Sequence, residues 1–130
     1  EAISPEMNGL GDCNEGFLRN DALLVVTILD DGYDVDSQGT VESWIAALRA
    51  AKHGDEDAFA VLVLTTDIDL GYWQLCHPDI YDMDKNRLRL LVEGIGHGFI
   101  GSICEETYTP FFEAAVAEVV EICDGLVIPQ

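Results

Sequence analysis

Three short apolar runs divide the chain, and each is followed by a segment in which apolar residues recur at helical spacing. The runs cover 22–29, 60–67 and 99–104. Their length and their Val, Leu and Ile content are typical of strands buried in a parallel sheet. We expect the first run to be buried on both faces, because it is almost continuously apolar until it ends in carboxylates at Asp30.

The first predicted helix follows Thr40, whose hydroxyl can cap the free amides of the first turn. It ends at Lys52, His53 and Gly54, a basic last turn followed by a glycine. Its core face is expected at Trp44, Ile45, Leu48 and Ala51.

Two more helices follow the second and third runs. Asp84 is the expected cap of the second helix, and Thr109 with Pro110 is the expected start of the third, which ends at Asp124 and Gly125. Their expected core faces are Leu88, Leu91, Val92 and Ile95 in the second helix, and Phe112, Val116, Val119 and Cys123 in the third.

The order β-α-β-α-β-α predicts an α/β, Rossmann-like, three-layer fold with a parallel sheet and crossover helices. Residues 1–20 mix Gly, Asn, Pro and acids without periodicity and are expected to be an irregular lead-in; the domain covers 21–125, and 126–130 form a tail. Three strands are half of a doubly wound domain. Because the first strand is too hydrophobic for an exposed edge, we expect another strand to pair with it.

Length, charge and hydropathy exclude some classes of partner. The 130 residues suit one domain, and their net charge of −19, from 25 acidic and 6 basic residues, excludes nucleic acid as a partner. No apolar run reaches the roughly 18 residues that a membrane span needs, so membrane insertion is not expected. Divalent cations would relieve the self-repulsion of so acidic a chain.

Aspartates gather where the first two strands end. In open parallel sheets the carboxyl ends of the strands border the ligand crevice, and oxygen ligands suit Mg²⁺ or Ca²⁺. A cation at this edge is one interpretation, and a solvated acidic rim that caps the next helix is the other. The residues concerned are Asp30, Asp31, Asp34 and Asp36 after the first strand, and Asp67 and Asp69 after the second.

Three stretches, 16–39, 50–67 and 98–124, carry a family resemblance. They resemble the von Willebrand factor A (vWA) domain of bacterial extracytoplasmic proteins, and the match covers only the C-terminal half of that fold. Such domains hold a metal ion through an Asp-x-Ser-x-Ser loop, a Thr and a late Asp. Asp31 matches the late Asp, Asp30 stands where the family commonly has Thr or Ser, and no Asp-x-Ser-x-Ser occurs in this chain.

The resemblance implies an extracytoplasmic protein, secreted, periplasmic or on the cell surface, that serves binding or adhesion. It further implies that a protein ligand is recognised through Mg²⁺ or Ca²⁺, held by Asp31 through water, with Asp30 and Asp67 as substitutes or supporting residues. The alternative is a structural or assembly module that binds no metal. It would complete its sheet with a partner chain, a second copy or an N-terminal half.

Catalysis is not expected. The pair Asp67 and Asp69 loosely resembles the nucleophile and acid of haloacid-dehalogenase-type phosphatases, and this remains the weakest alternative. No lysine lies beyond Lys85, so the cation that phosphoryl chemistry requires near the last strand is missing.

Four cysteines lack the spacing of a zinc site, which leaves two disulfides in an oxidising compartment or buried free thiols. Cys76 and Cys104 both follow strands, whereas Cys13 precedes the first strand and Cys123 ends the last helix. The topology therefore favours Cys76–Cys104 and Cys13–Cys123 among three connectivities.

Overall fold

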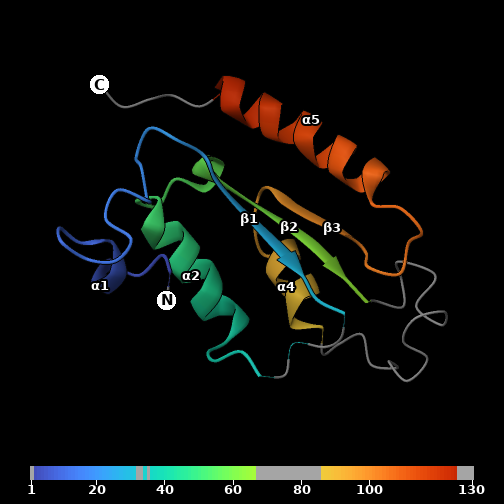
Figure 1. Ribbon diagram of the computed structural model, residues 1–130, viewed down its shortest axis with the longest axis horizontal. Helices are drawn as coiled ribbons and strands as arrows, with labels where there is room; N and C mark the ends of the chain where they lie inside the picture. Colours follow the sequence, from blue (N-terminus) through green and yellow to red (C-terminus); the bar gives the residue numbers. More distant parts are fainter. Residues whose placement is uncertain (1, 32–33, 35, 67–85, 126–130) are drawn as a thin grey trace.

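The computed structural model describes residues 2–31, 34, 36–66 and 86–125 and has an α/β fold (Figure 1). Within these ranges the order β-α-β-α-β-α is confirmed, and the strands form one parallel sheet in the order β1-β2-β3. The strands are β1 (Leu24–Leu29), β2 (Phe59–Thr65) and β3 (Gly98–Ser102); the helices are α1 (Pro5–Asn8), α2 (Val41–Ala51), α4 (Arg87–Glu93) and α5 (Thr109–Gly125), with a 3₁₀ turn, η1, at Glu56–Ala58.

The sheet lies between two helical layers. In Figure 1, α5 crosses one face of the sheet, and α2 and α4 lie on the opposite face. The α5 side is a small core in which Ala60 and Leu62 meet Ala115 and Ile122. The other side is larger and joins Phe59, Val61 and Val63 of β2 to Ile45, Leu48, Leu88, Leu91 and Val92 of α2 and α4. This is half of a Rossmann-like fold.

β2 is the centre of the molecule, and every one of its residues is buried. It pairs with β1 from Leu24 opposite Phe59 and with β3 from Gly98 opposite Val61. A strand with neighbours on both sides and helices on both faces has a continuously apolar sequence. The burial of β2 was therefore predicted correctly from its sequence.

The expectation that the first strand is buried on both faces is wrong. Burial alternates along β1, and the side chains of Val25 and Leu29 are 41% and 59% exposed. Two causes combine. Within the described residues β1 is an edge strand with one neighbour, and α5 packs over Ala60 and Leu62 of β2 and leaves this face of β1 partly open.

α2 begins and ends where the sequence predicted. Thr40 is the N-cap and forms a capping box, in which its hydroxyl accepts the Ser43 N–H at 3.2 Å and Ser43 Oγ accepts the Thr40 N–H at 2.9 Å. Hydrogen bonds from its own backbone N–H and from Thr40 hold the pKa of Glu42 in this first turn below its usual value.

Two other helices differ from expectation. α4 is capped by Asn86, whose side-chain oxygen accepts the Arg89 N–H, whereas the predicted cap Asp84 lies outside the described residues. In α5 the predicted core positions Phe112 and Val119 are confirmed, whereas Val116, 57% exposed, and the exposed Cys123 were predicted wrongly. The observed face is Phe111, Phe112, Ala115, Val119 and Ile122, because the small Ala115 lets the helix approach the sheet closely.

Lys52, expected as part of a basic last turn, is the C-cap of α2 and is only 4% exposed. Its ammonium group donates to the carbonyl oxygens of Arg19 at 2.7 Å and Ala22 at 2.6 Å. Desolvation lowers its pKa, an effect that nearby Asp55 and Asp21 partly offset. The lysine thereby ties the lead-in segment to the end of α2. That segment is not wholly irregular, because Pro5–Asn8 forms the single turn α1.

Candidate functional site

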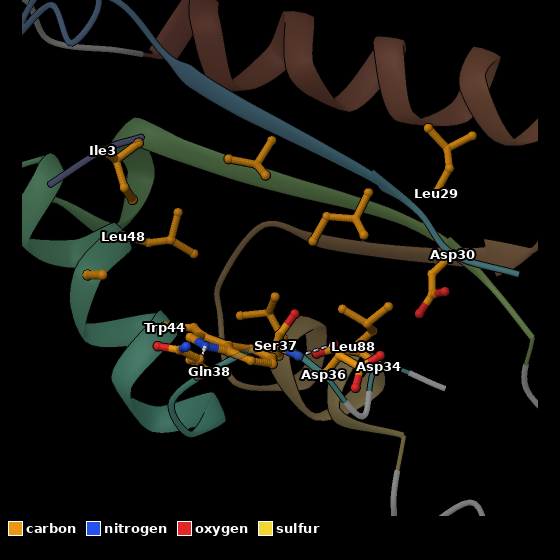
Figure 2. Close-up of a pocket in the computed structure, with 14 residues that line it drawn as sticks. Ile3, Leu29, Asp30, Asp34, Asp36, Ser37, Gln38, Trp44, Leu48 and Leu88 are labelled. Carbon is orange, nitrogen blue, oxygen red and sulfur yellow. Dashed lines mark hydrogen bonds between the residues drawn. The ribbon is translucent and has the colours of Figure 1, made fainter. Parts of the chain in front are cut away.

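A pocket of about 800 Å³ lies beside β1 (Figure 2). Its floor is apolar and comes from alternate residues of β1, Val26 and Ile28, together with Leu48 of α2 and Leu88 of α4. Among the described lining residues none belongs to β2 or β3. The pocket is therefore on the outer side of the sheet, next to its edge strand, where a further strand or helix would lie in a wider sheet.

The backbone of β1 is open along the same edge. The Asp30 N–H donates to the Leu64 carbonyl at 2.9 Å. Every second residue counted back from Asp30, which includes Val26 and Ile28, therefore turns its backbone N–H and C=O groups toward β2. The intervening residues Val25, Thr27 and Leu29 turn their N–H and C=O groups outward. Within the described residues these outward groups form no hydrogen bond. Three donors and three acceptors at strand spacing thus have no partner in the part of the chain that the structure describes.

Acidic side chains line one end of the pocket. Asp30, Asp34 and Asp36 lie at this end, and Ile3 from the lead-in segment lies at the other (Figure 2). Asp31 is exposed and is not among the lining residues. The structure therefore brings together three of the four acids predicted after the first strand. The predicted companions Asp67 and Asp69 lie outside the described residues.

Asp34 is held by an arginine. Its Oδ1 accepts the Ser37 N–H at 3.1 Å, and its buried Oδ2 lies 3.5 Å from Arg87 Nη1, an ion-pair distance rather than a hydrogen bond. Arg87 also donates to the carbonyl oxygens of Ser37, at 2.9 Å, and Gly39. The carboxylate of Asp34 is thus partly neutralised, which leaves the exposed Asp36 as the acid most available to a ligand.

Trp44 completes this arrangement. The Arg87 guanidinium carbon lies 4.1 Å from the centre of the Trp44 ring, and the Trp44 indole N–H donates to the Gln38 carbonyl at 2.8 Å. Trp44 of α2 and Arg87 of α4 thus hold Asp34 and residues 37–39 beside the pocket. Sequence reasoning missed the role of Arg87. The available signal was its rarity, since only six basic residues accompany 25 acids.

Metal-binding geometry is not evident at this edge. Among the described residues, no three His, Cys, Asp or Glu side chains are grouped so that they could hold a metal ion. Asp67, one of the three predicted ligands, is outside that set.

The predicted Cys13–Cys123 disulfide is contradicted, because both cysteines are free and exposed. Cys123 lies on the outer surface of α5, whereas the adjacent Ile122 packs against the sheet. Cys104, two residues beyond β3, is disulfide-bonded. Its predicted partner Cys76 falls outside the described residues, so that pairing stays a prediction.

Comparison with protein-family models, curated proteins and solved structures gives no match. The geometry of β1 and its pocket is therefore the basis for a functional proposal. In the ranges that the structure describes, no helix combines the length and apolar character needed to cross a bilayer.

Proposed function

We propose that this chain is a protein-binding module that completes its sheet by pairing β1 with a strand of a partner protein. The observation that carries the proposal is the outer edge of β1, where the backbone groups of Val25, Thr27 and Leu29 have no hydrogen-bond partner among the described residues. Addition of a strand to such an edge is a general mode of peptide recognition, in which main-chain hydrogen bonds supply affinity.

Two further features support this reading. The exposed side of β1 carries Thr27 and the partly exposed apolar residues Val25 and Leu29. An exposed hydrophobic edge strand is a liability unless something covers it. The usual protective devices are charges, prolines or bulges on the strand, and the sequence Leu24–Leu29 contains neither charge nor proline. Its edge is therefore suited to pairing.

The test uses a proline at an outward-facing position. Thr27→Pro removes one outward N–H and places a ring on the edge, and it leaves the β1–β2 hydrogen bonds of Val26 and Ile28 in place. The probe is a capped nonapeptide that alternates threonine and valine. We expect the probe to protect the amides of Val25, Thr27 and Leu29 from hydrogen exchange in the wild type. Thr27→Pro should weaken its binding about tenfold.

Thr27→Val is the matched control, since it keeps the N–H and suits a strand. Circular dichroism would establish that both variants retain the fold. Equal binding to the wild type and Thr27→Pro, or no protection of the three amides, would rule out strand addition at β1.

A second candidate is cation-dependent recognition of an acidic group on a protein ligand, as the vWA resemblance implies, in an extracytoplasmic setting. What favours it is the position of Asp30 and Asp31 directly after β1, at the edge of the sheet that borders ligand sites in α/β proteins. In this proposal Asp31 holds Ca²⁺ or Mg²⁺ through water, and Asp30 and Asp67 support it.

Calorimetric titration of Ca²⁺ and Mg²⁺ tests this candidate. We expect saturable binding to the wild type and at least about tenfold weaker binding to Asp31→Ala, because a hard cation depends on its few carboxylate ligands. Asp12→Ala, another exposed aspartate, controls for the loss of one charge. Identical heats for Asp31→Ala and Asp12→Ala would eliminate Asp31 as a ligand.

A further inference from the structure

The pocket beside β1 is lined by β1 residues that face one side of the sheet, the side to which alternate residues of an added strand would also project. Side chains of a strand alternate between the two faces of a sheet, so every second residue of a partner strand would project on the side of Val26 and Ile28. These two residues line the pocket. The pocket has a volume of about 800 Å³, which is enough for a large side chain. Its floor is apolar and includes residues of the neighbouring helix α2.

The rim of the pocket adds a charge requirement. Asp36 lines the pocket and is exposed, whereas Asp34 is occupied by Arg87. A residue two positions from the anchoring one projects from the same face about 7 Å away. On the partner strand a lysine or arginine at this spacing would lie toward the acidic end of the pocket, next to Asp36.

A second copy of the chain does not meet this requirement. Each copy carries the net charge of −19, and the same aspartates follow β1 in both. Pairing of two β1 strands would also place no basic side chain near the rim, since the residues from Leu24 to Leu29 are all uncharged. The favoured occupant is thus a strand from a different, basic segment of protein.

We propose that the pocket is a specificity site for a large apolar side chain, phenylalanine or leucine in kind, on a partner strand paired with β1. A lysine or arginine two residues from that anchor lies against Asp36. This inference rests on the proposed function, because the anchor reaches the pocket only from a strand along β1. It goes beyond that function by defining which strands bind.

Four capped nonapeptides test the inference by calorimetry. The anchor probe is Thr-Val-Lys-Thr-Phe-Thr-Lys-Val-Thr, whose lysines flank the phenylalanine so that either strand direction serves. One variant replaces Phe by Ala, another replaces both Lys by Glu, and the fourth peptide is the threonine–valine strand probe. We expect the anchor probe to bind about tenfold more tightly than its Ala variant, because Phe buries a large apolar area. The anchor probe should also bind about threefold more tightly than the Glu variant, and this difference in affinity should decrease as salt is added.

A pocket-filling variant locates the effect. Ala47 is exposed on α2 and lines the pocket, so Ala47→Phe should occupy the space and reduce the anchor probe to the affinity of the Ala peptide. Ala46→Phe adds the same side chain at an exposed neighbour that is not among the lining residues, and it should leave the preference for the anchor probe intact. Circular dichroism establishes that both variants fold.

The outcomes separate the two proposals. If all four peptides bind equally and Thr27→Pro weakens them all, strand addition stands and the specificity pocket is overturned. An anchor preference that survives Ala47→Phe also overturns the pocket. If no peptide binds up to its solubility limit, or if only dimerisation of the chain itself is seen, both proposals fall.

Discussion

Phe59→Ala is expected to lower the free energy of unfolding by about 3–5 kcal/mol, the largest loss that a single truncation should cause here. Phe59 begins β2, is only 1% exposed, and packs in the core between the sheet and helices α2 and α4. Truncation removes its transfer free energy and leaves a cavity among side chains that strands and helices hold in place. Because domains of this size are stable by only about 5–15 kcal/mol, a large share of the stability would be lost.

Urea denaturation followed by circular dichroism measures this loss. Phe17→Ala is the control, because Phe17 is 60% exposed in the lead-in segment and its truncation should change the stability by less than about 0.5 kcal/mol. Similar effects of the two substitutions would contradict a core centred on β2.

Arg87→Ala is expected to lower the stability by about 2–3 kcal/mol and to release Asp34, Ser37 and Gly39 from α4. The guanidinium group donates to two carbonyl groups, of Ser37 and Gly39, lies over the Trp44 ring, and is near Asp34. Its removal leaves those carbonyl groups without this donor and leaves the Asp34 carboxylate, whose Oδ2 is buried, without this counter-charge. Loss of one partner from such a network is more costly than the net value of the network.

Hydrogen exchange of the Trp44 indole N–H, which donates to the Gln38 carbonyl, is the specific measurement for this loop. It should become markedly faster in Arg87→Ala. Arg87→Lys keeps the charge but lacks the planar guanidinium group with its several N–H donors. It should therefore be more stable than Arg87→Ala but less stable than the wild type. Arg19→Ala removes a 64% exposed arginine and serves as a control. Unchanged indole exchange in Arg87→Ala would show that the loop is held by other contacts.

The order of elements was predictable because it depends on local features. Thr40 caps α2 through its own first turn, and β2 has the continuous apolar run of a strand enclosed on every side. The acidic end of the pocket was also partly predictable, since Asp30, Asp34 and Asp36 follow one strand within a few residues. Local hydrogen bonds and short-range spacing are properties that the sequence carries without reference to the rest of the fold.

The surroundings of β1 were not predictable in the same way. A strand rich in Val, Leu and Ile has the same composition whether one or both of its faces are covered, and only the position of α5 over Ala60 and Leu62 leaves Val25 and Leu29 open. The core face of α5 was predicted only in part, for a related reason. Ala115 and Val116 are neighbours on the helix, and the choice between them depends on where the helix meets the sheet.

The class of fold, the parallel sheet and the concentration of acidic residues after β1 could thus be predicted from the sequence. Those follow from periodicity, caps and turn residues that act over a few positions. Three other features became known only from the tertiary structure: β1 is an edge strand among the described residues, a pocket lies beside it, and Arg87 contacts Ser37 and Gly39 about 50 residues earlier in the chain. These features arise where segments distant in sequence meet, and local propensity contains no information about which segments those are.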